Sequence, residues 1–437
     1  MNIVLLSGGS GKRLWPLSNE IRSKQFLKIL KNDRGVYESM VQRMYRQISS
    51  VDKETDITIA TSKAQISTII SQLGGKVGIS LEPCRRDTFP AIALTAAYLH
   101  DVKGLHDNEV VVVCPVDPYV EKEYFEALKE LSILAEKGNS NLMLLGIEPT
   151  YPSDKYGYII PETTDKVSRV VTFKEKPDTK TAQDYLSKGA LWNGGVFAFK
   201  LKYLLDKAHE LIDFIDYEDL FNKYEMVERI SFDYAVVEKE SNIQAMRFSG
   251  KWKDLGTWNT LTESIEEKVI GNAMLNESCE NVHVVNELDI PVLCMGLKNT
   301  IVSVSAEGIL VSDKNESGQI KPYVDKIEQP VMFSEKSWGE YRVLDISENS
   351  MVIKVTLKAG QKMSYHSHEK REEIWNIISG NGRAIVDGVE YAVKMGDTIA
   401  IKAGCKHTLV ADVELNVIEV QSGQKINVND KQKYELR

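Results

Sequence analysis

The feature that most constrains the fold is the junction between an apolar segment and a glycine-rich turn near the N-terminus. Residues 3–6 are apolar and predict a buried strand, and residues 8–11 read Gly-Gly-Ser-Gly. Lys12 and Arg13 follow the glycines, and Lys24 precedes a second apolar segment. A flexible loop after a strand can turn its amide groups toward an anion, and cations on both sides favour phosphate. The pattern therefore predicts a phosphate-binding loop at the end of a strand.

Two common phosphate-binding loops are excluded by spacing. A Walker loop needs glycine five residues before its Gly-Lys pair and Ser or Thr after it, where this chain has Leu6 and Arg13. A dinucleotide fingerprint needs glycine three residues after Gly11, where Leu14 stands. An ordinary turn between a strand and a helix fits the glycines alone. The flanking cations and the later motifs favour phosphate binding over that alternative.

Strand-like and helix-like segments alternate from residue 1 to about residue 265. Apolar runs predict central parallel strands at residues 57–60, 110–114 and 142–147. The stretches between them predict helices at residues 37–48, 90–99 and 124–137. This alternation predicts a doubly wound, Rossmann-like α/β sheet with helices on both faces. Ligands of such sheets lie at the carboxyl ends of the strands, so the motifs there should converge.

The pattern changes after residue 265. Short strand-like pieces at residues 282–285, 292–295, 301–304 and 309–311 predict a small β linker segment. Turn signals then recur at regular spacing from about residue 331, which predicts a sandwich or barrel. We therefore expect three parts, residues 1–265, 266–330 and 331–437.

Composition limits the partners and the compartment. A chain of 437 residues exceeds one ordinary core, and its net charge of −9 argues against nucleic acid. No apolar run approaches the roughly 20 residues that span a bilayer, and no charged-then-apolar leader opens the chain. The five cysteines include no C-x-x-C pair, which favours reduced, mostly buried thiols. We expect a cytoplasmic protein without a membrane or nucleic-acid partner.

The N-terminal motifs resemble a known enzyme family. GGSGKRLWPLS and SKQFL, at residues 8–18 and 23–27, resemble the signature of sugar-nucleotide pyrophosphorylases, most closely the mannose-1-phosphate guanylyltransferases. Lys12 replaces the family's threonine, whereas Arg13 and Lys24 are kept. The resemblance implies synthesis of GDP-mannose and pyrophosphate from GTP and mannose 1-phosphate, with Arg13 and Lys24 as the catalytic cations. A homodimer is the family expectation, and another nucleotide or sugar remains an alternative.

Two aspartates are candidate metal ligands. Asp117 ends the stretch VVVVCPVD, which resembles the family's V-x-P-x-D-H with Pro118 in place of histidine. Asp254 lies in WKDLGTW, which resembles W-x-D-L-G-[ST]-W. Mg²⁺ prefers carboxylate oxygens and substrate phosphates. The resemblance implies that Asp117 and Asp254 together hold Mg²⁺.

Residues 81–92, LEPCRRDTFPAI, resemble the family's EPxGRNTAPAI and predict part of a nucleotide site. Asp87 replaces an asparagine, which exchanges an amide donor for a carboxylate acceptor and weakens the guanine assignment. Thr88 also has the position of a helix cap, with Pro90 just inside the helix. The resemblance implies nucleotide contacts from Leu6, Gly8, Gly9, Ser10, Gly11, Lys12, Glu82, Arg86, Asp87 and Thr88.

Further stretches match the family's sugar-phosphate site. They are YGYI at 156–159, FKEKP at 173–177, LWNGGVF at 191–197 and FDYAVVEK at 232–239. The resemblance implies that Lys176 lies near the sugar phosphate and that Glu175 and Asn193 lie near sugar hydroxyls. Gly157 and Tyr158 complete the predicted sugar-phosphate site.

The last part of the chain contains both motifs of a cupin barrel. The candidate ligands are His366, His368, Glu373 and His407. Histidines two residues apart share one face of a strand, and imidazole with carboxylate suits a divalent transition metal. A metal-free barrel is the alternative.

This part also resembles the phosphomannose isomerase half of bifunctional relatives, although its histidine run is thinned. Isomerisation needs a general base, which the sequence does not identify. A structural or carbohydrate-binding cupin behind a degenerate front domain therefore stays open.

Overall fold

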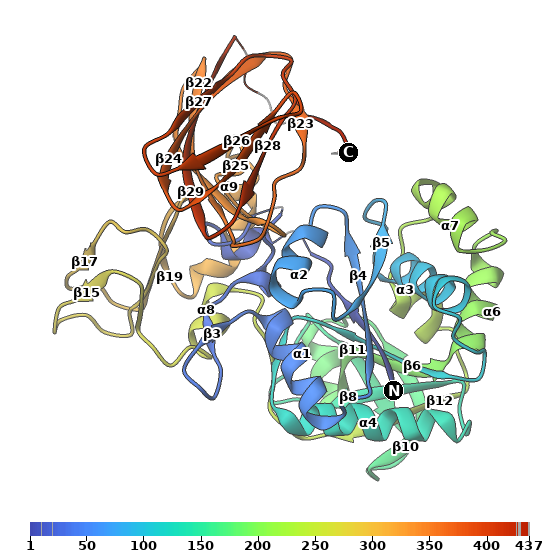
Figure 1. The fold of residues 1–437 in the computed structure, drawn as a ribbon. Coiled ribbons are helices and arrows are strands. Elements are labelled where there is room, and N and C mark those ends of the chain that lie inside the picture. Colours follow the sequence, from blue (N-terminus) through green and yellow to red (C-terminus); the bar gives the residue numbers. More distant parts are fainter. Residues whose placement is uncertain (10, 20, 425, 427–429, 436–437) are drawn as a thin grey trace. The chain divides into compact units, whose positions relative to one another are not determined.

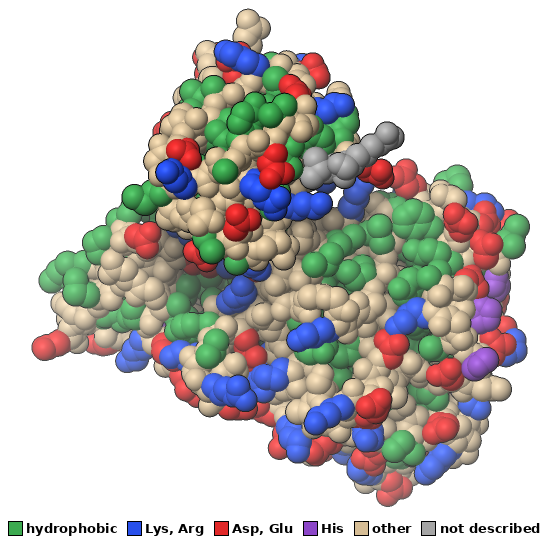
Figure 2. All heavy atoms as spheres, viewed as in Figure 1, with side chains coloured by type: hydrophobic (Ala, Val, Ile, Leu, Met, Phe, Trp, Pro, Cys, Tyr) green, Lys and Arg blue, Asp and Glu red, His purple; other side chains and the backbone are tan. Residues whose placement is uncertain are grey.

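The computed structural model describes residues 1–9, 11–19, 21–424, 426 and 430–435 (Figure 1). The chain forms two compact units: residues 1–9, 24–66 and 75–256, and residues 10–23, 67–74 and 257–437. None of the described helices is long and apolar enough to cross a membrane. On the face drawn in Figure 2, acidic and basic side chains are interspersed.

Within the described residues, the first unit contains one nine-stranded sheet. Its strands, in spatial order, are β5 (Gly78–Glu82), β4 (Asp56–Ser62), β1 (Asn2–Leu6), β6 (Val110–Pro115), β11 (Leu191–Lys200), β8 (Leu142–Ile147), β12 (Ile243–Phe248), β10 (Val167–Lys174) and β9 (Gly157–Pro161). Strand β1 pairs in parallel with β4 and β6, which confirms the apolar runs at residues 3–6, 57–60 and 110–114 as strands, and β1 and β6 are buried along most of their length.

The sheet is mixed rather than parallel throughout. Strand β11 runs antiparallel to both β6 and β8, whereas β8 is parallel only to β12. Residues 142–147 were expected to form a parallel strand. This is wrong for the pairing of β8 with β11, which is antiparallel. An apolar run shows that a strand is buried, but not the direction of its neighbours.

Helices cover both faces of this sheet. Helix α3 (Thr88–Ala97) shares an apolar cluster with Val111 and Val113 of β6. The β6 side chains that point to the other face, Val110, Val112 and Cys114, are also buried. Helix α4 (Lys122–Glu136) contacts this strand. Because alternate side chains point to opposite faces, these helices lie on opposite sides. The remaining helices of the unit are α1 (Met40–Val51), α5 (Thr179–Ser187), α6 (Leu201–Leu211) and α7 (Tyr217–Lys223).

The predicted helix at residues 37–48 is wrong at its start. Residues 37–38 form β3, which pairs with β2 (Leu30–Lys31), and Ser39 caps α1 in a capping box with Gln42. The helix therefore begins at Met40, directly after the serine of a Ser-x-x-Gln capping signal. The apolar spacing alone had placed its start too early.

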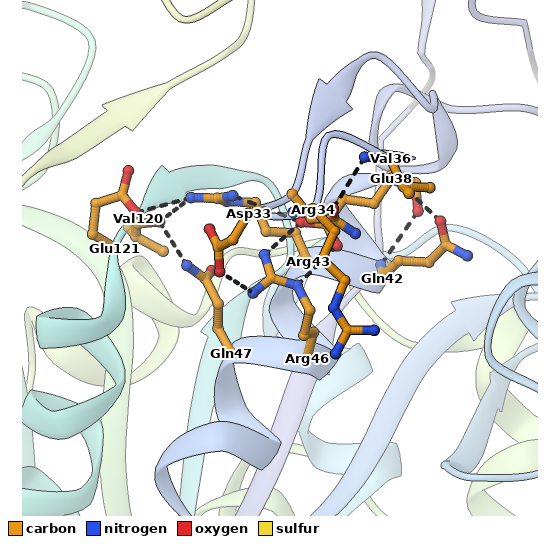
Figure 3. Close-up of polar contacts among 12 residues, drawn as sticks. Asp33, Arg34, Val36, Glu38, Gln42, Arg43, Arg46, Gln47, Val120 and Glu121 are labelled. Atoms are coloured by element: carbon orange, nitrogen blue, oxygen red, sulfur yellow. Dashed lines mark hydrogen bonds and ion pairs between the residues drawn. The ribbon is translucent and has the colours of Figure 1, made fainter.

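Helix α1 is fastened to the segment that follows Asp117 (Figure 3). Arg43 donates to the Glu121 carboxylate at 2.9 Å and to the carbonyl of Val120 at 3.4 Å. Gln47 donates to the same carbonyl at 3.5 Å. These bonds fix the end of β7 (Pro118–Val120), the short strand directly after Asp117.

The longest stretch of the second unit, residues 257–437, begins with α8 (Trp258–Thr262) and continues with a β segment of short strands. Strands β14 (Val269–Ile270), β16 (His283–Asn286), β18 (Thr300–Ser305) and β19 (Gly308–Asp313) form one sheet, and β15 (Ala273–Leu275) pairs with β17 (Val292–Cys294). The predicted pieces are confirmed to within two residues at each end. The segment also contains a helical turn, α9 (Lys321–Val324), that the pattern did not indicate. Helix α2 (Ile66–Leu73) lies almost wholly in this unit.

The C-terminal part is the predicted sandwich or barrel, and its described strands form two sheets. In the described residues, one sheet contains β20 (Phe333–Lys336), β21 (Gly339–Ile346), β22 (Ser350–Leu357), β29 (Leu415–Gly423), β24 (Arg371–Ser379) and β27 (Thr398–Ile401). The other contains β26 (Val389–Lys394), β25 (Asn381–Val386), β28 (His407–Ala411), β23 (His366–Ser367) and β30 (Gln432–Lys433). Trp375 and Val417 of the first sheet share a core with Ala384 and Leu409 of the second.

Candidate functional site

Two carboxylates of the first unit converge on one ammonium group. Asp117 follows the end of β6, and Asp254 ends β13 (Trp252–Asp254), which pairs with β7 so that Asp254 lies opposite Pro118. The Lys24 Nζ lies 2.7 Å from Asp117 Oδ2 and 3.2 Å from Asp254 Oδ1. The structure therefore brings together three residues that the sequence placed in one site.

The electrostatics of this group suit a cation and phosphates. Burial lowers the pKa of Lys24, but the charges of Asp117 and Asp254 outweigh burial and raise it, so the lysine stays charged. Both carboxylates are about one-third exposed, at 34% and 39%. They offer hard oxygen ligands from two paired strands, the donor set that Mg²⁺ takes together with substrate phosphates.

The glycine-rich turn and the 82–88 segment meet in the first unit. Gly8 and Gly9 are exposed beyond β1, which ends at Leu6, and Gly9 has a φ of 113° that favours glycine. The Arg85 guanidinium donates to the Gly9 carbonyl at 3.1 Å. The two predicted parts of the nucleotide site thus lie side by side.

Glu82 ends β5, and its carboxylate accepts a hydrogen bond from the Tyr224 hydroxyl at 3.0 Å. Burial raises the pKa of Glu82, although the Tyr224 bond and the Arg85 charge oppose the rise. Arg86 donates to the backbone carbonyl of Glu225.

Asp87, and not Thr88, caps α3. The Asp87 carboxylate accepts from the Thr88 amide at 2.8 Å, and its φ of 72° is rare for a residue with a side chain. The Thr88 hydroxyl accepts instead from the Phe232 amide at 2.8 Å. The expectation of Thr88 as the cap is wrong, because the helix begins at Thr88 and the carboxylate of the preceding residue reaches its first free amide.

The predicted sugar-phosphate residues lie together. A Cβ at Gly157 would lie 2.5 Å from Glu175 Oε2 and 3.3 Å from Asn193 Cβ, so a larger residue there would displace the Glu175 carboxylate. Lys176 Nζ donates to Glu175 Oε1 at 2.5 Å, and Lys176 has a φ of 42°. Glu175 is buried whereas the Lys176 side chain is 58% exposed. A fixed carboxylate and a reachable cation suit a sugar and its phosphate, respectively.

Three histidines meet inside the cupin sandwich. His366 pairs with His407 across β23 and β28, and one ring nitrogen each from His366, His368 and His407 lies within 4.8 Å of the others. Each Nδ1 lies within 2.9 Å of a backbone carbonyl, which only accepts, so each Nδ1 carries the proton. Burial lowers the pKa of His366 to about 2, which keeps that ring neutral.

The fourth predicted ligand adjoins this triad. Glu373 Oε1 lies 3.1 Å from His368 Nε2, and Oε2 lies 3.4 Å from His407 Nε2. Burial would raise the pKa of Glu373, but its bonds to His368 and His407 outweigh burial and lower it. Three imidazoles and one carboxylate are a donor set that fits a divalent transition metal. Arg371 donates to His368 Nε2 at 2.9 Å and to Glu373 Oε1 at 3.2 Å, so an ion using these atoms competes with the guanidinium.

Family models account for most of the chain. The nucleotidyl transferase model matches residues 2–269, more than half of the 437 residues. The chain belongs to this family. A second model, for the mannose-6-phosphate isomerase C-terminal region, matches residues 327–435 of this nucleotidyl transferase.

Curated relatives match this nucleotidyl transferase over nearly its whole length. A mannose-1-phosphate guanylyltransferase from Salmonella montevideo is 28% identical over 98% of this chain and 97% of its own. The xanthan biosynthesis protein XanB from Xanthomonas campestris pv. campestris (strain B100) is 29% identical over 99% and 97%. The crystal structure of mannose-1-phosphate geranyltransferase from Thermus thermophilus is 28% identical, covers 74% of this chain and 98% of that chain, and has a TM-score of 0.62.

Some predicted site residues belong to the second unit or make other contacts. Lys12 and Arg13 lie in the second unit, where Lys12 Nζ is 2.8 Å from Asp325 and Arg13 is exposed. Ser10 falls outside the described residues. Tyr158 is fully buried, and its hydroxyl bonds to Ser153 and Trp192, so its side chain serves packing. The nucleotide roles of Lys12 and Arg13 stay predictions.

Sequence reasoning missed Asp233 as a member of the sugar-phosphate group. Asn193 Nδ2 donates to Asp233 Oδ1 at 2.6 Å, while Asn193 Oδ1 accepts from the Gly195 amide at 3.1 Å. Burial, and then the charge of Glu175, raise the pKa of Asp233 to about 6. The motif FDYAVVEK contained the signal, since its aspartate matches the family pattern.

A buried carboxyl group inside the cupin was also missed. Glu419 lies opposite Trp375 on the paired strands β29 and β24, and Gln421 lies opposite Glu373. Burial, and then the charge of Glu373, raise the pKa of Glu419 to about 7. Glu419 lies in IEVQSG at residues 418–423, which resembles the family's IEVQxG, but that match does not indicate the raised pKa, because the pKa depends on packing. The five cysteines are free thiols, but only Cys114 and Cys294 are buried.

Proposed function

We propose that this nucleotidyl transferase makes GDP-mannose and pyrophosphate from GTP and mannose 1-phosphate in the cytoplasm, with Mg²⁺. The convergence of Asp117 and Asp254 on Lys24 supports the proposal most strongly. The full-length relatives named as mannose-1-phosphate guanylyltransferases give the substrates. XanB is named for xanthan biosynthesis, which agrees with a supply of nucleotide sugar for polysaccharide. A homodimer remains an expectation from the resemblance.

In the proposed reaction, an oxygen of the sugar phosphate attacks the α-phosphorus in line and pyrophosphate leaves. Asp117 and Asp254 would hold Mg²⁺, which would supply neutralisation of the charge on the phosphates. Lys24 contributes a point charge to the pyrophosphate, and Arg13 can bind two of its oxygens. Lys176 holds the attacking phosphate, since it presents an exposed ammonium beside a buried carboxylate.

Glu82 supports guanine as the base. Guanine presents two donors on its pairing edge, N1–H and the N2 amino group, and a carboxylate is an acceptor only. Adenine presents a donor and an acceptor there, so the carboxylate would face a lone pair. Glu82 therefore compensates for the loss of the amide at Asp87, which had weakened the guanine assignment.

Metal removal tests the Mg²⁺ requirement. We expect excess EDTA to reduce pyrophosphate release from GTP and mannose 1-phosphate to background, and added Mg²⁺ to restore it, because the carboxylates alone repel the phosphates. Release is measured by a coupled pyrophosphate assay, and mass spectrometry identifies GDP-mannose. Full turnover in EDTA would contradict the metal requirement.

The pKa of Asp233 predicts a pH-dependent stability. A folded-state pKa of about 6, above the ordinary 3.8, adds stability below pH 4 that is lost as the pH rises through 6. We therefore expect Asp233→Asn to match the wild type near pH 4 and to be more stable by about 1–2 kcal/mol at pH 8. Urea unfolding at both pH values measures this. The exposed Asp184→Asn is the control, and a gain for Asp233→Asn that does not change with pH would contradict the assignment.

The cupin triad supports mannose-6-phosphate isomerisation as a second candidate function. Glu419 offers a carboxyl group that exchanges a proton near neutral pH, as isomerisation between adjacent carbons requires. The match to the isomerase C-terminal model points the same way.

Metal analysis of the full chain tests this second function. We expect about one transition metal per chain, because the triad and Glu373 form one site. His407→Ala should lose the metal and any conversion of mannose 6-phosphate to fructose 6-phosphate, whereas His100→Ala, at an exposed residue of the first unit, should keep both. Isomerisation by metal-free protein, or none by metal-loaded protein, would contradict the candidate.

A further inference from the structure

Residues 11–19, which we call the signature loop, pack against one turn of the β segment in the second unit. This turn, residues 305–308, joins β18 to β19. A Cβ at Gly308 would lie 2.6 Å from Trp15 Cζ2, and the φ of Gly308 is 146°. Only glycine allows this approach, so the turn is shaped to accept the Trp15 ring.

Two buried side chains of the same turn bind the loop through hydrogen bonds. The Ser305 hydroxyl donates to the Pro16 carbonyl at 2.6 Å, and Asn19 Nδ2 donates to Glu307 Oε1 at 2.8 Å. Ser305 and Glu307 are 5% and 6% exposed. Leaving such buried groups without partners is costly, so these bonds hold the loop in one place.

Glu307 also binds the start of the cupin. Its Oε1 accepts from the amides of Met332 and Phe333 at 3.0 and 3.1 Å, and Asn19 Nδ2 donates to the Phe333 carbonyl at 3.1 Å. Strand β20 begins at Phe333. One carboxylate therefore connects the signature loop to the first cupin strand.

We propose that the 305–308 turn positions the signature loop for the nucleotide, with Glu307 as its positioning residue. The inference rests on the proposed function, because Arg13 is the exposed cation that the loop presents. A phosphate-binding loop performs best when its conformation is fixed before substrate arrives. The loop thus depends on residues outside the 1–265 part that the sequence assigned to the transferase.

Glu307→Ala tests this positioning role in the full chain. We expect the KM for GTP to rise by roughly tenfold, with the KM for mannose 1-phosphate unchanged. Amide hydrogen exchange in residues 11–19 should accelerate. Glu307→Gln keeps an acceptor for Asn19 and should restore both properties. The matched control is Glu335→Ala, since Glu335 is 7% exposed and accepts hydrogen bonds from Ser71 and Gln72.

The outcomes are separable. Equal GTP KM and equal exchange in Glu307→Ala and Glu335→Ala would overturn the inference, and so would faster exchange without a change in GTP KM. If Glu307→Ala does not fold, Ser305→Ala is measured in its place. We expect the KM for GTP and the amide exchange of residues 11–19 to rise in this variant too, but by less. Wild-type protein without transferase activity would refute the proposed function, and with it the positioning role, whereas the exchange data would still show whether the turn holds the loop.

Discussion

Replacing Asp117 with asparagine is expected to lower pyrophosphate release from GTP and mannose 1-phosphate by roughly two to three orders of magnitude. Asparagine keeps the shape of the side chain but removes the charge that, with Asp254, holds Mg²⁺. Stability should change little, because Asp117 is 34% exposed and its ion pair with Lys24 is partly solvated. Steady-state kinetics and thermal unfolding of the same preparation measure both effects.

A control separates the metal role from the loss of any carboxylate. Asp56 of the same unit forms an ion pair with Lys103 away from the proposed site, and Asp56→Asn should retain wild-type turnover. Asp254→Asn should behave like Asp117→Asn, since both carboxylates contact the same ammonium. Unchanged turnover in Asp117→Asn would refute the metal assignment.

The second large effect concerns the choice of base. Glu82→Gln is expected to lower kcat/KM for GTP by about a hundredfold or more, because the amide replaces one acceptor oxygen with a donor that faces the donors of guanine. Discrimination against ATP should weaken at the same time. Competing GTP and ATP in one reaction, with the two nucleotide sugars separated by mass, measures the ratio directly.

Tyr224→Phe is the matched control for this variant. It removes the hydroxyl that donates to Glu82 but leaves both acceptor oxygens in place. Selectivity for GTP should persist. If Glu82→Gln keeps the wild-type preference, another residue reads the base.

The strands were the most predictable part of the fold. The run VVVVCP is buried along nearly its whole length as β6, and continuous apolar runs of this kind identify inner strands. The direction of β11 was not predictable, because strand direction depends on how the chain returns and leaves no trace in residue spacing. Within the second unit, the pattern gave the short strands but not the turn that receives the signature loop.

The candidate site was predictable only through motifs. Asp117 and Asp254 are far apart in the chain, and the pairing of β7 with β13 that joins them has no signal in either segment alone. Glu82 and Lys176 likewise came from motif matches. Asp233 was missed because its role depends on burial beside Glu175, which is a property of the packed structure.

Pyrophosphate release measured across a matrix of nucleoside triphosphates and sugar 1-phosphates tests the proposed function most directly. We expect the highest kcat/KM for GTP with mannose 1-phosphate, and GDP-mannose as the product. Activity confined to another pair, or no activity with any pair, would contradict the assignment of the substrates or of the transferase reaction itself.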